Sequence, residues 1–129
     1  MGQAKNLLAT AGRGDTLLLR LAEAVQAGKR NWDRTAASGS VASARRLFAR
    51  LSRGPAAAWL QDVRVGVGSD DCIAITAGSG DVVVHIEADT DTPTFVGIAE
   101  ARASRDLIEA CEGLSLDEAV EFLRRHLGH

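Results

Sequence analysis

The chain has few aromatic side chains and few residues that carry sulfur. Among 129 residues there is no tyrosine, and there are only three phenylalanines, two tryptophans, two cysteines and one methionine. The core must therefore be aliphatic, and the strands predicted below lack the aromatic residues on which single-stranded nucleic acids stack. The apolar content of 46% is ordinary for a globular protein. We expect one domain spanning residues 1–129.

Long apolar segments are also missing. No stretch approaches the roughly 20 apolar residues that cross a bilayer. Near the start of the chain, polar residues and glycines at positions 10–15 interrupt the apolar region that a signal peptide needs. Two isolated cysteines are more typical of buried thiols in a reducing compartment than of a disulfide framework. We therefore expect a cytoplasmic protein that binds no membrane.

The motifs of common catalytic and cofactor sites do not occur in the sequence. His85, His126 and His129 show none of the spacings of a metal site. The glycine pairs lack the context of a nucleotide-binding loop, and there is no nucleophile-elbow sequence. The sequence indicates no cofactor and no metal, and it offers an enzyme no convincing nucleophile or acid–base pair.

Acidic residues gather between positions 70 and 91, but without the alternation of a calcium-binding loop. We interpret them as a solvated end of the predicted strands. The group consists of Asp70, Asp71, Asp81, Glu87, Asp89 and Asp91.

Cys72 is the candidate for a reactive thiol. Such a thiol needs an electropositive, partly exposed setting. Cys72 instead follows Asp70 and Asp71, whose charges would raise its pKa, and Cys111 lies beside Glu109 on the apolar side of a predicted helix. Both cysteines are interpreted as core thiols. A sulfur-trafficking role for Cys72 is the less favoured alternative.

Hydrophobic periodicity predicts an α+β domain. Helical spacing predicts helices from Asp15 to Gly28, after Ser40 to Gly54, from Thr92 to Gly113 and after Ser115, with a short turn of helix over 55–59. Period-two alternation predicts strands at 63–67, 72–76 and 82–87, and Gly78–Asp81 is a strong hairpin signal. The expected fold is a three-stranded antiparallel sheet with helices before and after it, in the order α-α-β-β-β-α-α.

Several details support individual helices. In the second helix, an inner face is formed by Val41, Ala44, Leu47, Phe48 and Leu51. In the third, Phe95, Ala99, Ala103 and Leu107 recur every four residues. Ser115 and Glu118 form a capping box that predicts the start of the last helix.

Charge is divided unevenly along the chain. Residues 1–59 carry ten Lys and Arg against three Asp and Glu, a balance of +7, and residues 60–129 carry five against fourteen, a balance of −9. We therefore divide the domain into a basic helical part at 15–60 and an acidic part at 61–129 that holds the β-meander and two helices. Residues 1–14 are either a flexible arm or a short helix.

The basic stretch is the most informative surface feature of the sequence. Its members are Lys29, Arg30, Arg34, Arg45, Arg46, Arg50 and Arg53. They predict either a docking surface for an acidic protein partner, including the acidic half of a second copy, or a nucleic-acid contact made through phosphates. The competing interpretation is that these arginines are solvated or lie over the acidic half of the same chain.

Two motifs resemble a known superfamily. The sequence ARASRDLIEACEGLSLDEA at 101–119 reads as a helix, a glycine stop and a helix start, and ADTDT at 88–92 reads as a turn into a helix. Over about residues 68–119 the chain thus resembles the superfamily of NifU-like iron–sulfur scaffolds and SufE-like sulfur acceptors. The resemblance implies helices before and after a small antiparallel sheet.

The cysteines that this resemblance would require do not match. Gly97 stands where a scaffold protein holds a cluster cysteine, and Ser69 stands where an acceptor holds its reactive cysteine. The resemblance therefore implies a frame that has lost its sulfur chemistry. The expected function is a non-catalytic interaction domain that binds an acidic protein or itself, with a nucleic-acid-binding accessory protein as the alternative.

Overall fold

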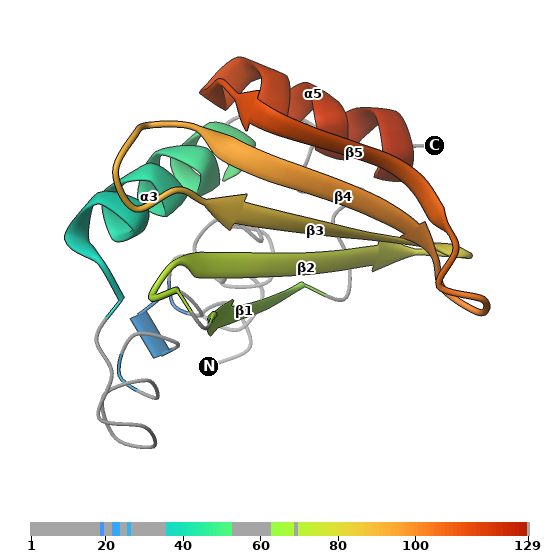
Figure 1. The fold of residues 1–129 in the computed structure, drawn as a ribbon, viewed down its shortest axis with the longest axis horizontal. Helices are drawn as coiled ribbons and strands as arrows, with labels where there is room; N and C mark the ends of the chain where they lie inside the picture. The colour runs from blue at the N-terminus through green and yellow to red at the C-terminus, as the bar shows by residue number, and fades with distance from the viewer. Residues whose placement is uncertain are drawn as a thin grey trace, which may run out of the picture.

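The computed structural model describes residues 36–52, 63–68 and 70–128, and also the single helical positions 19, 22, 23 and 26. Within these ranges a five-stranded antiparallel sheet is preceded by one helix and followed by another (Figure 1). The elements are α3 (Ser38–Ser52), β1 (Arg64–Val67), β2 (Ile73–Ser79), β3 (Val82–Ala88), β4 (Phe95–Ala101), β5 (Leu107–Leu114) and α5 (Leu116–Leu127). The strands lie side by side in chain order.

The predicted three-stranded sheet with two helices on each side is wrong. Residues 95–101 and 107–114, which were expected to form one helix, form the strands β4 and β5. The recurrence of Phe95 and Ala99 every four residues is also a multiple of two, so it fits one face of a strand as well as a helix. Val96 and Ile98 are β-branched and favour the extended backbone that is observed.

The turn between β4 and β5 contains no glycine or proline, and for this reason it was not predicted from the sequence. Its sequence is ARASRD, and it closes through a hydrogen bond from the Ala101 N–H to the Asp106 carbonyl at 2.9 Å. Arg105 adopts a positive φ of 61°. Gly113, interpreted as a helix stop, instead has a φ of 64° where the register of β5 shifts by one residue.

Other predicted elements are confirmed. The segment after Ser40 is helical, and Ala44, Leu47, Phe48 and Leu51 of its inner face are at most 3% exposed. The strands β1, β2 and β3 match the three that alternation predicted.

The predicted hairpin turn and the predicted start of the last helix are also confirmed. Gly80, with a φ of 58°, lies in the turn of the β2–β3 hairpin, in which Ser79 pairs with Val82. The capping box is formed, because Ser115 accepts from the Glu118 N–H while the Glu118 carboxylate accepts from the Ser115 N–H.

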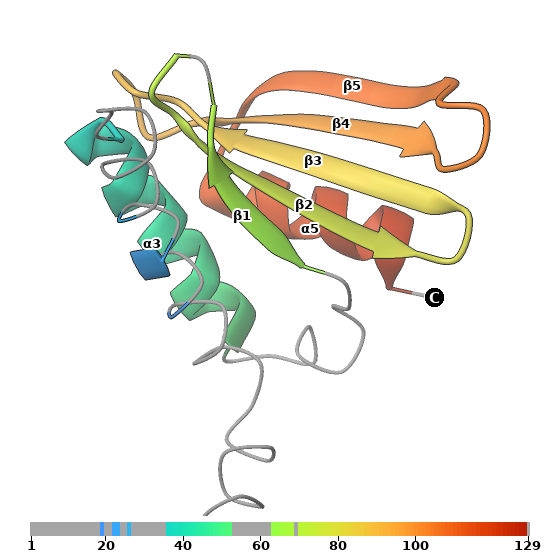
Figure 2. The same cartoon turned by 90° about the horizontal axis from the view of Figure 1, so that it is seen from below.

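Both described helices cover the same face of the sheet, and in Figure 2 the strands pass in front of α5. The core lies between these two layers. Phe48 from α3, Phe122 from α5 and Phe95 from β4 are all at most 1% exposed. The start of α3 is bound to the sheet because the buried Ser40 hydroxyl donates a 2.7 Å hydrogen bond to the Ala88 carbonyl.

Gly97 sets how closely α5 approaches the sheet. A Cβ atom at this position would lie 3.0 Å from the Phe122 ring and 3.1 Å from a Leu114 methyl group. The absence of a side chain at position 97 therefore lets Phe122 pack closely against β4.

Some predictions fall outside the described residues. The arm at 1–14, the inner face of the helix from Asp15 to Gly28 and the turn of helix over 55–59 are among them. In the described ranges, no helix combines the length and the apolar character that crossing a membrane requires.

Candidate functional site

The sheet face opposite α3 and α5 is called the open face. Its side chains form three cross-strand rows, which the strand register defines. The middle row is Arg64, Thr76, His85, Ile98 and Ala110; one flanking row is Gly78, Val83 and Glu100; the other is Gly66, Ala74, Glu87 and Val96. Val83, Val96 and Ile98 are half-buried, whereas helix-facing Val84, Ile86 and Ala99 are fully buried.

A pocket of about 300 Å³, here called the cationic pocket, lies at one end of the open face. It is lined by Arg64, Thr76, Gly78, Val83 and Arg102. Arg102 is held there by two hydrogen bonds, from its N–H to the Asp81 carbonyl at 2.6 Å and from its Nε to the Gly80 carbonyl at 3.0 Å. None of the described residues that line this pocket carries a carboxylate.

The guanidinium of Arg102 lies directly over β2 at Gly78. A Cβ atom built at Gly78 would overlap one terminal nitrogen of the guanidinium. The absence of a side chain at position 78 thus provides the space that the guanidinium occupies, and it leaves the charge facing outward from the sheet.

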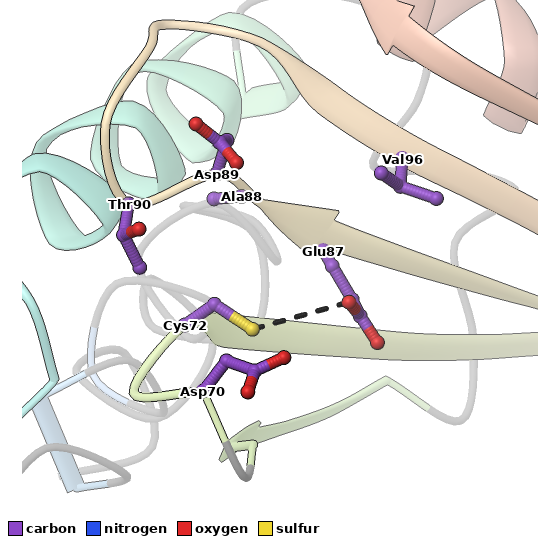
Figure 3. A pocket seen from close by; sticks show the side chains of 7 residues that line it. All are labelled: Asp70, Cys72, Glu87, Ala88, Asp89, Thr90 and Val96. Atoms are coloured by element: carbon purple, nitrogen blue, oxygen red, sulfur yellow. Dashed lines mark hydrogen bonds between the residues drawn. The ribbon is translucent and has the colours of Figure 1, made fainter.

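A second pocket of about 290 Å³, here called the acidic pocket, lies at the other end of the open face (Figure 3). It is lined by Asp70, Cys72, Glu87, Ala88, Asp89, Thr90 and Val96. The Cys72 Sγ lies 3.9 Å from a Glu87 carboxylate oxygen (Figure 3). Desolvation, followed by the Glu87 charge, raises the pKa of the Cys72 thiol. This setting opposes formation of a nucleophilic thiolate.

Asp89 has a structural role in the loop after β3. Its carboxylate accepts from the backbone N–H groups of Asp91 and Thr92 and from the Thr92 hydroxyl, at 3.0, 2.8 and 2.9 Å. These bonds, led by that from the Thr92 N–H, lower the pKa of Asp89. Among the described residues there is no group of three or more side chains that could hold a metal ion.

A chain of polar contacts lies between the two pockets. The Thr76 hydroxyl is 3.1 Å from His85 Nδ1, and His85 Nε2 is 3.0 Å from a Glu100 carboxylate oxygen. Arg105 approaches the same oxygen at 3.8 Å. The sequence did not suggest this contact set, because it depends on the pairing of β2 with β3 and of β3 with β4.

A hydroxyl, an imidazole and a carboxylate in this order also occur in nucleophilic catalysis. Acyl transfer additionally needs donors aimed at the developing oxyanion. Around Thr76 the backbone N–H groups of β2 lie in the plane of the sheet, between paired strands on both sides. We therefore interpret the chain as cross-strand contacts that help to fix the register.

The predicted basic surface is only partly described. Arg45 and Arg46 are exposed on α3, and Arg50 forms an ion pair with Asp117 of α5. One of the predicted binding arginines is thus paired within the chain. Lys29, Arg30, Arg34 and Arg53 lie outside the described residues.

Cys111 lies on β5 and not on a helix, which corrects its predicted setting. Its Sγ is 3.7 Å from the Glu109 carboxylate. Desolvation, with a smaller effect of the Glu109 charge, raises the pKa of this thiol. Glu109 also pairs with Arg125 and His126 of α5, and its bond to His126 is the main cause of its lowered pKa.

No family model, curated protein or solved structure matches this chain. The resemblance to the NifU-like and SufE-like superfamily therefore stays a prediction. Residues 107–114 of the compared segment form β5, and the SLDEA sequence begins α5.

Sequence reasoning missed the cationic pocket. Arg64 lies within the predicted strand at 63–67, and Arg102 lies inside the segment from Thr92 to Gly113 that was predicted to be a helix. The two come together because β1 pairs with β2 while the end of β4 reaches the β2–β3 turn. Arg64, Thr76 and Val83 lie on the three strands that alternation predicted, whereas Arg102 joins them only when residues 95–101 form a strand.

Proposed function

We propose that the chain is a non-catalytic interaction domain that binds a protein partner through the open face. The observation that carries this proposal is a sheet face that neither α3 nor α5 covers, on which Val83, Val96 and Ile98 are half-buried and two pockets of opposite charge lie toward the two ends. The pockets hold Arg64 and Arg102 at one end, and Asp70 and Glu87 at the other.

The apolar character of the open face supports binding. When an antiparallel sheet has one face in water, its outward positions are usually polar. Here the outward positions include Val83 on β3 and Val96 and Ile98 on β4. Leu107 and Ile108 of the edge strand β5 extend the apolar surface and are 65% and 49% exposed. Exposed apolar side chains gathered on one face are typical of an interaction site.

The charges at the two ends would orient the partner. A surface that is positive at one end and negative at the other favours one binding direction and disfavours its reverse. The exposed arginines of α3 give no comparable arrangement, because Arg50 is already paired with Asp117.

Photo-crosslinking in the native cell tests this proposal. A photoreactive phenylalanine analogue at Ile98, in the middle of the open face, is expected to form an adduct with a protein partner. The same analogue at Glu121, which is exposed on α5, is the matched control and is expected to form none. No adduct from position 98, or equal yields from both positions, would contradict the proposed function.

A further inference from the structure

Building on the proposed function, we infer that the partner is a second copy of this chain. In this arrangement the two open faces pack against each other, with the strands of the two copies running in opposite directions. The two-fold axis runs across the strands along the middle row of Thr76, His85 and Ile98.

The strand register supplies the geometric argument. The row of Gly78, Val83 and Glu100 lies two residues to one side of the middle row, and the row of Ala74, Glu87 and Val96 lies two residues to the other. Two residues of a strand span about 6.8 Å, so the flanking rows are equally distant from the axis. The rotation therefore places each flanking row over the other row of the second copy.

The same rotation brings opposite charges together. It keeps every strand over its counterpart, so Gly78 on β2 faces Ala74 on β2 of the second copy. The Arg102 guanidinium, which lies over Gly78, then meets the acidic pocket of the second copy, where Glu87 and Asp70 are exposed. Because the interface is symmetric, each such contact forms twice.

The apolar residues near the middle of the interface can pack together, because Ile98 and Ala110 lie on the axis row and the half-buried Val83 and Val96 lie beside it. At the β1 end of the same row the exposed Arg64 lies opposite Arg64 of the second copy, where solvent screens the two like charges. Sheets that pack face to face lie about 10 Å apart, a gap that an arginine and a carboxylate can bridge together.

The size of the face sets the expected strength. Five strands about 4.8 Å apart, the longer of them seven or eight residues long, give a face of roughly 20 by 23 Å, or about 460 Å². A standard stable interface buries about 800 Å² on each partner, so a face of this size falls in the class of weak, transient interfaces. We expect a dimer in reversible equilibrium with the monomer, and its charged contacts make it weaken with added salt.

Sedimentation equilibrium of the full chain at two salt concentrations is the first experiment. The expected result is a mass that rises toward twice that of one chain with concentration at low salt, and that falls when salt is added. A monomer at every concentration and at both salt levels would overturn the second-copy inference.

A charge-swap pair tests the arrangement itself. Arg102→Glu places a carboxylate at the end that Arg102 occupies, and Glu87→Arg places a guanidinium at the end that Glu87 occupies. Each variant alone is expected to raise the dimer dissociation constant by about tenfold or more, because like charges then face each other twice. An equimolar mixture should restore association, since both contacts between position 102 of one variant and position 87 of the other are then attractive.

Arg45→Glu is the matched control, because it makes the same change of charge at an exposed position of α3, away from the open face. It is expected to leave the dissociation constant unchanged. Failure of the mixture to associate, or an equal effect of Arg45→Glu, would overturn the inference. Circular dichroism of each variant checks that the fold is retained.

The outcomes also separate this inference from the proposed function. A cellular adduct of position 98 with a different protein, together with a monomer in solution, would support an interaction domain and contradict the second copy. A crosslink from position 98 within its own chain would contradict both.

Discussion

The buried hydroxyl of Ser40 accepts a 2.7 Å hydrogen bond from the backbone N–H of Ile73. Ile73 is the first residue of β2, and the same hydroxyl donates to the Ala88 carbonyl at the end of β3. Ser40 is fully buried, so no solvent replaces these bonds when they are lost. One side chain on α3 thus joins the ends of two neighbouring strands.

We therefore expect Ser40→Ala to lower the free energy of unfolding by about 2–3 kcal/mol, because a buried N–H and a buried carbonyl both lose their partner. Urea denaturation measures the change. Ser38→Ala, at an exposed position on the same helix, is the control and should change stability by less than about 0.5 kcal/mol. Equal effects of the two variants would contradict the role assigned to Ser40.

Gly97→Ala should destabilise the protein by about 1–3 kcal/mol, since the added methyl group meets the Phe122 ring and Leu114 in a closed core. Gly66→Ala is the matched control on β1, where a Cβ atom would have no neighbour within 4 Å. That variant should be neutral or slightly stabilising, because alanine restricts the unfolded chain. Thermal unfolding of both variants checks the pair, and a stable Gly97→Ala protein would show that α5 can shift.

Acid should destabilise the fold through specific carboxylates. Hydrogen bonds lower the pKa values of Asp89, Glu109 and Glu118, with the main donors being the Thr92 N–H, His126 and the Ser115 N–H respectively. In the folded state these groups bind protons less readily than in the unfolded chain. Their contribution is therefore complete above about pH 5 and is lost as the pH falls through their lowered pKa values.

Urea midpoints measured from pH 6 to pH 3 test this dependence. Glu118→Gln should flatten the acid-side slope, while Glu112→Gln, at an exposed position on β5, should leave the slope as it is. A midpoint that is constant over this range would contradict the assigned hydrogen bonds.

Both thiols should react slowly with a small alkylating reagent at neutral pH, and Cys72 should react more slowly than Cys111. Cys72 is buried and Cys111 is half-buried, and both have raised pKa values. The rates should rise with pH as the thiolates form. Cys72→Ser and Cys111→Ser assign the two rates. Labelling of Cys72 as fast as a free thiol would restore the sulfur-trafficking alternative.

The parts of the fold that sequence predicted are those with local signals. Two of these signals depend on a few adjacent residues, namely the capping box of Ser115 and Glu118 and the glycine turn at Gly80. The inner face of α3 follows from the helical repeat of apolar residues within one segment. The β4–β5 hairpin has no such signal. Its turn lacks glycine and proline, and small residues such as Ala99 and Ala101 suit a helix as readily as a strand.

The candidate site could not be predicted, for a related reason. Each pocket draws residues from several strands, so it depends on the pairing of β4 with β3. Once residues 95–101 were assigned to a helix, Arg102 could not be placed near Arg64, nor Glu100 near His85. Individual charges were visible in the sequence, but their neighbours were set by long-range register.

The order of the strands has a consequence for how the chain folds. Because every strand pairs with the one that follows it in the sequence, the sheet can assemble through short loop closures that cost little chain entropy. The contacts that span the greatest sequence separation are those of α3 with α5. The docking of α3 onto the sheet is therefore the step that should limit the folding rate. Substitutions at Leu47 or Phe48 should slow refolding more than substitutions in the β4–β5 turn.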